Sequence, residues 1–375
     1  MRLTDPVGIG VIGCGNISAA YLTNLTASRD VEVLACADAI PERAAARAAQ
    51  FGVPRACAAV ELLADPRIEL VVNLTVPNAH ASIGLAAIEA GKHVYNEKPF
   101  ATTREDGLRI LEAAANKRVV VGGAPDTFLG AGIQTCLKLI AEGRVGEPLA
   151  ASAFMLGRGP ENWHENPAFF YQPGGGPLFD VGPYYVTALV CALGSVRRVA
   201  AAARVLYPER TATKGPRAGE TFQVSTPTFV SASLEFASGA IATLVTSFGI
   251  SGHDLPNIQI YCAGGILSVP DPNTFGGPVR FRPADEESVW GEIPLAYRHT
   301  DSRAPRNFRG LGVLDMARAI RNGEQPRASG RLAFHALDVM VSILESHATG
   351  HAVTVESSCD RPPLLPLDAD LELAR

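Results

Sequence analysis

The chain has 375 residues, of which 47% are hydrophobic and 19% are charged. This composition supports a sizeable core and argues against intrinsic disorder. The formal net charge of −5, without any Lys/Arg-rich run, argues against a nucleic-acid-binding surface, and no apolar run reaches the roughly 18 residues that a membrane span needs.

The first third of the chain alternates between strand and helix signals. Nearly continuous apolar strands separated by helices predict an α/β domain over residues 1–123, with a doubly wound parallel sheet covered on both faces. We expect strands over Val7–Ile12, Val31–Ala37, Leu70–Val76, His93–Asn96 and Val119–Val121, and helices up to Ser28 and over Pro41–Gln50, Ala79–Ala90 and Glu105–Lys117.

The pattern changes after residue 123, where strand signals follow one another without helices between them. This predicts a second, α+β domain over residues 124–375 with an open-faced, largely antiparallel sheet, and loops over Tyr207–Gly219 and Asp271–Gly277. We expect strands over Leu149–Met155, Val196–Val205, Thr228–Phe236, Ala240–Phe248 and Ile258–Cys262, and helices over Ala131–Glu142, Gly310–Arg321 and Arg331–Thr349.

The seven cysteines are scattered and show no Cys-x-x-Cys spacing. Cys14 and Cys36 fall inside apolar, strand-like segments. This usage is typical of reduced, buried thiols in a cytoplasmic protein rather than of a disulfide framework or zinc site. A single basic residue precedes the first strand, so we expect no signal peptide. No clustered carboxylates or His-x-His spacing predict a metal.

A glycine-rich turn, Gly13-Cys14-Gly15-Asn16-Ile17, joins the first strand to the first helix. Gly13 would permit a tight turn, and Gly15 would let the backbone approach a pyrophosphate on the helix N-terminus, with Asn16 and Ile17 beside it. Ser18 stands where the full dinucleotide motif has its third glycine. An ordinary strand–helix turn is therefore the alternative.

Asp38 follows the second strand, where an acidic residue binds the adenosine ribose hydroxyls of a dinucleotide. Its carboxylate would repel a 2′-phosphate, which favours NAD over NADP. Arg43, five residues further on, could reach such a phosphate and keeps NADP open. The alternative for Asp38 is a solvated strand end.

Thr75, Pro77 and Asn78 follow the third strand at the same edge of the sheet, and His80 comes early in the next helix. We expect these residues near the cofactor. For His80, a surface or capping histidine is an equally open interpretation.

Glu97-Lys98-Pro99 follows the fourth strand. A lysine at the end of a buried strand needs a partner, and burial or a neighbouring charge can move its pKa toward a role in proton transfer. The alternative is a surface lysine paired with Glu97.

Four segments together resemble the Gfo/Idh/MocA oxidoreductases, which include glucose–fructose oxidoreductase, inositol dehydrogenases and dimeric dihydrodiol dehydrogenase. The resemblance implies a Rossmann domain, a second domain whose sheet packs against another subunit, and a sugar or polyol substrate between nicotinamide and sheet. The segments are Gly13–Ile17, Thr75–His80, Glu97–Pro99 and Gly174–Tyr184.

The resemblance also implies roles for three residues. In the family, the lysine matching Lys98 contacts both the nicotinamide ribose and the substrate, and Asp180 matches an aspartate of the substrate site. Many members carry an acid/base histidine where this chain has Tyr184, whereas some branches have tyrosine there. A tyrosine can pass a proton if a cation lowers its pKa from about 10, and Lys98 is the candidate cation. For Asp180 the alternative is a helix cap, and Pro183 should kink a helix that began at Pro177.

The loop Gly157–Gly176 contains Trp163-His164 and further aromatic residues. Aromatic rings beside polar groups suit stacking on sugars, although they could equally plug a gap in the core. His164 is the rival acid/base, because histidine titrates near neutral pH. Arg306–Arg309 are interpreted as solvated or interface charges.

These features predict a nicotinamide-dependent oxidoreductase that exchanges hydride between NAD(P) and a sugar, polyol or related cyclic alcohol or ketone. Two alternatives are an NAD-dependent glycosidase that oxidises its substrate transiently, and a non-enzymatic NAD- or sugar-binding regulator. The expected protein is a cytoplasmic homo-oligomer.

Overall fold

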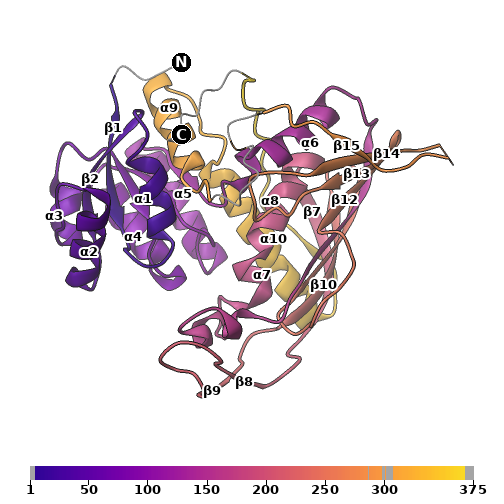
Figure 1. The fold of residues 1–375 in the computed structure, drawn as a ribbon, viewed down its shortest axis with the longest axis horizontal. Coiled ribbons are helices and arrows are strands. Elements are labelled where there is room, and N and C mark those ends of the chain that lie inside the picture. The colour runs from indigo at the N-terminus through magenta and orange to yellow at the C-terminus, as the bar shows by residue number, and fades with distance from the viewer. Residues whose placement is uncertain (1–4, 286, 298–299, 301–306, 368–375) are drawn as a thin grey trace.

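The computed structural model describes residues 5–285, 287–297, 300 and 307–367. Figure 1 shows two sheets side by side, with the five-stranded sheet and its helices in indigo and purple, and the long strands of the second sheet at the other end. Helix α10 (Gly330–Thr349) lies between the two regions and packs on both α5 (Arg104–Lys117) and β7 (Val196–Arg204). The two-part architecture predicted from the sequence is confirmed.

The first sheet is fully parallel, with strand order β2-β1-β3-β4-β5. Helix α3 was not predicted, and β3 ends at Asn73 rather than Val76. The chain leaves the sheet there because the Asn73 side chain accepts the Thr75 amide and donates to the His80 carbonyl. The elements are β1 (Val7–Ile12), α1 (Ser18–Leu25), β2 (Val31–Ala37), α2 (Pro41–Phe51), α3 (Ala59–Ala64), β3 (Leu70–Asn73), α4 (Pro77–Glu89), β4 (His93–Asn96), α5 (Arg104–Lys117) and β5 (Val121–Gly123).

The second sheet has nine strands in the order β15-β14-β13-β12-β6-β11-β10-β7-β16. Its neighbours are antiparallel except for β11 and β6, so the largely antiparallel prediction is confirmed. The predicted loop Tyr207–Gly219 contains one strand of a β8–β9 hairpin. The strands are β6 (Pro148–Leu156), β7 (Val196–Arg204), β8 (Glu209–Thr211), β9 (Thr221–Gln223), β10 (Phe229–Phe236), β11 (Ile241–Ser247), β12 (Ile258–Cys262), β13 (Gly265–Val269), β14 (Val279–Pro283), β15 (Gly291–Ile293) and β16 (Val353–Thr354).

A helix was expected only around Asp180 and Tyr184, and the extent of α8 to Leu193 was missed because the helix has no polar face. All of its residues are buried, and a helix that is apolar all round shows no 3.6-residue alternation. The remaining elements are η1 (Thr127–Leu129), α6 (Ala131–Ala141), η2 (Pro160–Asn162), η3 (Pro167–Tyr171), α7 (Gly176–Asp180), α8 (Gly182–Leu193), α9 (Leu311–Asn322) and α10 (Gly330–Thr349).

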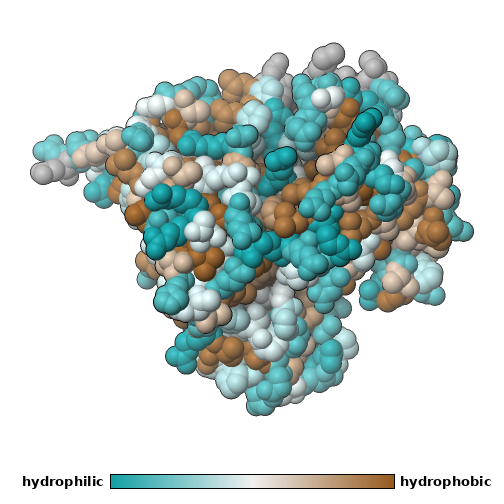
Figure 2. All heavy atoms as spheres, turned by 180° about the vertical axis from the view of Figure 1, so that it is seen from behind, coloured by the Kyte–Doolittle hydropathy of each residue, from teal (hydrophilic) through white to brown (hydrophobic). Residues whose placement is uncertain are grey.

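Helices cover one face of the second sheet, with α8 on β6 and α10 on β7. On the other face, Ile241 of β11 and Tyr261 of β12 both lie opposite Ala150 of β6 and remain exposed. Seen from behind, the molecule carries hydrophobic patches between hydrophilic areas (Figure 2). The sheet is therefore open-faced.

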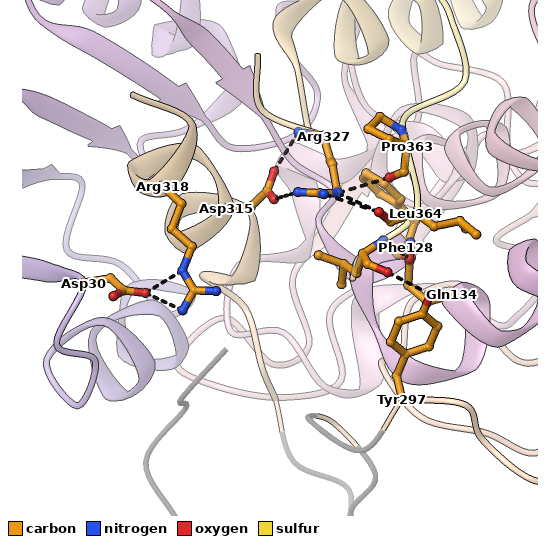
Figure 3. A network of polar contacts seen from close by, with 10 residues as sticks. Asp30, Phe128, Gln134, Tyr297, Asp315, Arg318, Arg327, Pro363 and Leu364 are labelled. Atoms are coloured by element: carbon orange, nitrogen blue, oxygen red, sulfur yellow. Dashed lines mark hydrogen bonds and ion pairs between the residues drawn. The ribbon is translucent and has the colours of Figure 1, made fainter. Parts of the chain in front are cut away.

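Helix α9 returns from the second region to the first sheet. Arg318 forms an ion pair with Asp30 at 2.7 Å, and Arg321 contacts Glu69. Figure 3 shows α9 held from both sides, because Asp315 also binds Arg327, which reaches the carbonyl of Leu364. These contacts hold α9 in place, and the segment before α9 lies at the carboxyl edge of the parallel sheet.

All seven cysteines are free, and five of them are buried. No group of side chains in the described ranges has the composition of a metal site. Within the same ranges, no helix combines the length and apolar character of a membrane span.

Candidate active site

The glycine-rich turn is tight for a steric reason. Gly13 has a φ of 101°, and a Cβ there would lie 2.4 Å from the carbonyl carbon of Leu74. A Cβ on Gly15 would meet nothing within 4 Å. Gly13 therefore serves the turn itself, whereas Gly15 leaves open space beside the backbone, as a bound pyrophosphate requires. Asn16 is exposed and Ile17 half-buried beside it.

Asp38 closes this turn from the end of β2. Its carboxylate accepts the Cys14 amide at 2.7 Å and the Ile40 amide at 2.8 Å. Arg43 is exposed on α2. The sequence analysis missed Arg47, one helical turn later, which donates to the Ser18 hydroxyl at 3.1 Å and the Gly15 carbonyl at 3.2 Å. A guanidinium thus lies at the position of the missing third glycine.

The loop after β3 is held by buried polar contacts. Thr75 donates its hydroxyl to Asn73 at 2.7 Å, Pro77 begins α4, and Asn78 is exposed. The two ring nitrogens of His80 lie 2.7 Å from the Pro99 carbonyl and 2.9 Å from the Thr75 carbonyl. Burial lowers the pKa of His80. The interpretation as a surface histidine is wrong, because His80 is buried and joins the Thr75 and Pro99 loops.

Lys98 lies at the end of β4 and reaches across to Asp180. Its ammonium is 2.7 Å from the Asp180 carboxylate and 2.8 Å from the Asp180 carbonyl. Glu97 accepts the Lys98 backbone amide at 2.7 Å and the Tyr21 hydroxyl at 3.0 Å. The alternative of a surface lysine paired with Glu97 is therefore wrong, because Glu97 holds the backbone and leaves the Lys98 side chain to Asp180.

The charge of Lys98 is stabilised in place. Burial lowers the pKa of this ammonium. Asp180, Tyr184 and Glu97 together raise the pKa by more than burial lowers it, so that the net pKa lies above the ordinary value. Lys98 is therefore suited to electrostatic stabilisation of an oxygen rather than to release of a proton.

The break between α7 and α8 exposes the carbonyl that Lys98 uses. Pro183 has no N–H, and the Tyr184 amide bonds the Val181 carbonyl at 3.1 Å instead of the Asp180 carbonyl. No side chain caps α8, so the helix-cap interpretation of Asp180 is wrong. The predicted kink is present, and it presents the backbone carbonyl and one carboxylate oxygen of Asp180 to the same ammonium.

Tyr184 is buried next to this pair. Lys98 Nζ and Arg309 Cζ each lie 5.6 Å from the centre of its ring. The hydroxyl accepts a hydrogen bond of 2.9 Å from Arg309, not from Lys98. Burial raises the pKa of Tyr184, and Lys98 and Arg309 offset only part of that rise. Interpreting Arg309 as a solvated charge was wrong, while Arg306 lies outside the described residues.

His164 lies in a different environment. Its Nδ1 accepts the Asn166 amide at 3.0 Å, and its ring lies edge-on to Trp163, Phe169 and Phe170, with Phe170 5.0 Å away. Among the described residues, no contact joins His164 to Lys98, Asp180 or Tyr184. The fold therefore brings three of the four predicted catalytic residues together and holds His164 apart.

Family models match both regions of the chain. The model described as "Oxidoreductase family, NAD-binding Rossmann fold" matches residues 7–123, and the "GFO/IDH/MocA C-terminal domain" matches residues 133–268.

Characterised relatives match over nearly the full length. A 1,5-anhydro-D-fructose reductase from Ensifer adhaerens is 28% identical over 93% of this chain and 98% of its own length. D-xylose 1-dehydrogenase (NADP(+)) 2 from Haloferax volcanii is 27% identical over 92% of this chain and 99% of its own.

Solved structures share the fold. Levoglucosan dehydrogenase in complex with NADH and L-sorbose superposes with a TM-score of 0.80 at 22% identity, covering 94% of this chain and 99% of that one. The chain therefore belongs to the Gfo/Idh/MocA family of nicotinamide-dependent oxidoreductases.

Proposed function

We propose that this enzyme interconverts a secondary alcohol and a ketone on a sugar, a polyol or a related cyclic compound. The observation that carries the proposal is the Lys98 ammonium, held 2.7 Å from Asp180 and beside Tyr184 at the carboxyl edge of a parallel sheet, where such folds bind ligands. The sugar substrates named for the relatives support it.

The cofactor would lie along that edge, with its nicotinamide accepting or returning the hydride when bound. Gly13, Gly15, Asn16 and Ile17 would receive the pyrophosphate, and Asp38 the adenosine ribose. The residues expected toward the nicotinamide are Thr75, Pro77, Asn78, His80, Glu97 and Lys98.

We infer NAD rather than NADP as the preferred cofactor. The Asp38 carboxylate would repel a 2′-phosphate. Arg43 and the partly buried Arg47 carry the opposite charge nearby, and the Haloferax relative uses NADP by name. Comparing the two cofactors decides this point.

Lys98, Asp180 and Tyr184 form a contact group, here called the cluster, and each would have its own role. Lys98 polarises the substrate oxygen, and Asp180 holds that ammonium and accepts a substrate hydroxyl. Tyr184 moves the proton, with His164 as the rival. In the oxidation, the hydroxyl proton leaves to the acid/base residue while the carbon–hydrogen bond breaks with its electron pair.

We further propose how the chain is organised. Residues 1–123 form the cofactor domain and 124–375 the substrate domain, with α9 returning to the first sheet. The open sheet face around Ile241 and Tyr261 would pair with a second copy of the chain, as exposed apolar area favours. The free cysteines support a cytoplasmic location.

A substrate screen tests the function. Sugars, polyols and keto-sugars are offered with NAD(H) and NADP(H) while the nicotinamide absorbance is followed, with Lys98→Ala as the matched inactive variant. Net NADH formation or consumption supports the proposal. Product release without net change in NADH would indicate the glycosidase, and NADH binding without any turnover would indicate the regulator. The relatives named above are dehydrogenases and reductases, which favours the first outcome.

A further inference from the structure

We propose that Arg309 is the positioning residue that aims the Tyr184 hydroxyl and stabilises its deprotonated form, so that Tyr184 rather than His164 carries the proton. The inference rests on the proposed function only in one respect, namely that the proton carried by Tyr184 is exchanged with the substrate. The contact between Arg309 and Tyr184 stands without it.

The direction of the hydrogen bond determines where the tyrosine proton points. A guanidinium has five donors and no acceptor. Tyr184 must therefore accept from Arg309 at 2.9 Å and direct its own proton elsewhere. In the described ranges, no second partner of this hydroxyl is found. The proton is thus free to be given to a substrate oxygen beside Lys98.

The charge of Arg309 is available to the tyrosine. Its other recorded acceptors are neutral: the side-chain oxygens of Asn273 at 2.7 Å and Asn307 at 3.0 Å. Over the residues that the structure describes, no carboxylate forms an ion pair with Arg309. Glu97 and Asp126 act on Arg309 only through space. A negative charge that develops on the Tyr184 oxygen would therefore be the one that Arg309 compensates directly, through a charge-assisted hydrogen bond.

The backbone around Arg309 is anchored by side chains from both proposed domains. The Asn24 side chain of α1 donates to the carbonyls of Asn307 at 2.9 Å and Arg309 at 2.8 Å. The buried Asp126 carboxylate accepts the amides of Gly310 at 2.8 Å and Gly312 at 3.0 Å. These contacts hold the main chain on both sides of Arg309, and the bonds to Asn273 and Asn307 hold its guanidinium.

Several charged or titratable groups face Tyr184 from the elements around it. Lys98 and Arg309 lower its pKa, Glu97 raises it, and Tyr95 lies within electrostatic reach. Burial is the largest cause and raises the pKa overall. Removing Arg309 takes away one of two stabilising cations, so the Tyr184 pKa should rise further while Lys98 remains.

The proton step balances with the hydride step. In reduction, the Tyr184 O–H bond would break as its proton bonds the carbonyl oxygen, and a bound reduced nicotinamide would supply the hydride that the carbon gains. In oxidation, the tyrosinate would take the hydroxyl proton, and a bound oxidised nicotinamide would accept the hydride that the carbon loses. Solvent restores the tyrosine between turnovers.

The test titrates the tyrosine directly, in the full chain and without substrate. Tyr184 is replaced by 3,5-difluorotyrosine, which ionises at lower pH, and its ionisation is followed by ultraviolet absorbance in wild type, Arg309→Lys and Arg309→Met. We expect the midpoint to rise by about one pH unit in Arg309→Met and by less in Arg309→Lys, which keeps a cation.

Tyr185 provides the matched control. It is also buried, but its hydroxyl accepts from Asn257 at 2.8 Å. The same fluorinated residue at position 185 should titrate unchanged in Arg309→Met. Equal shifts at both positions, or no shift at position 184, would overturn the proposal, whatever the substrate screen finds.

A kinetic arm uses any sugar that turns over in the screen. The alkaline limb of kcat should move in Arg309→Met in the same direction as the titration, with partial rescue by Arg309→Lys. Should Arg309→Met fail to fold, Arg309→Lys and Arg309→Gln carry the same comparison. A limb that stays in place in Arg309 variants and moves in His164→Gln would assign the proton to His164.

Discussion

Two regions offered an acid/base residue, and they differ in what surrounds it. Tyr184 lies buried between two cations, one of which bonds its hydroxyl. His164 lies among aromatic rings, in a loop where Trp163 is 59% and Phe169 40% exposed. Proton transfer needs a fixed donor and a stabilised charge, whereas stacking on sugars needs exposed rings. We therefore propose that Lys98, Asp180 and Tyr184 carry out the chemistry and that the loop contacts the substrate.

The largest expected effect concerns the cluster. Lys98→Met should lower kcat by about 10²–10³-fold, because it removes the cation that stabilises the substrate oxygen in the transition state. The binding of NADH, measured by fluorescence, should change far less. Lys117→Met, a surface lysine paired with Glu89, serves as the control. Comparable losses of kcat and NADH affinity would contradict this role.

Substituting Tyr184 and His164 one at a time compares the two acid/base candidates directly. Tyr184→Phe should lower kcat by about 10²-fold or more, while His164→Gln should change KM more than kcat. Steady-state kinetics on the same sugar separates these outcomes. If His164→Gln loses kcat to the same extent, the division between cluster and loop is wrong.

The pH dependence follows from the raised pKa of Tyr184. Below this pKa the phenol is protonated, so reduction should proceed at neutral pH and fall as the pH rises through the pKa. Oxidation needs the tyrosinate and should increase over the same interval. Rates measured in both directions across alkaline pH, with Tyr184→Phe as control, should show opposite limbs that the variant lacks.

A smaller effect is expected at Asp38, which follows β2 and lies outside both the cluster and the aromatic loop. Asp38→Ala should weaken NAD binding by about tenfold, because it removes the expected ribose contact, and should weaken NADP binding less. Isothermal titration with both cofactors checks this. An unchanged ratio between them would mean that Asp38 only holds the turn through the Cys14 amide.

The smallest effect belongs to the loop. Trp163→Ala should raise KM by a few-fold with kcat unchanged, as expected when stacking area is lost. If kcat falls as KM rises, the loop would instead take part in the chemical step. Phe222, partly buried beside Tyr171, offers a matched aromatic control as Phe222→Leu.

The sequence analysis predicted the two sheets and the tight turn after β1, because both depend on local patterns. The proximity of Lys98, Asp180 and Tyr184 followed from motifs that resemble those of one family. The sequence analysis missed the extent of α8, whose uniform apolar character hides its helical period. It missed Arg47, whose role at the turn depends on how α2 packs against α1. Lys98 lowers the pKa of Tyr184 as predicted, although burial raises it overall, but the hydrogen bond to the hydroxyl comes from Arg309, which was not predicted.

The amino-acid sequence by itself determined the family, the parallel sheet and the motif residues Lys98, Asp180 and Tyr184, since apolar alternation and short motifs act over a few neighbouring residues. Only the tertiary structure decided which cation bonds the tyrosine. Arg309 and Tyr184 are 125 residues apart, and they meet because α9 is drawn back onto the first sheet by its ion pairs. No local pattern encodes such a meeting, because it depends on the packing of the whole chain.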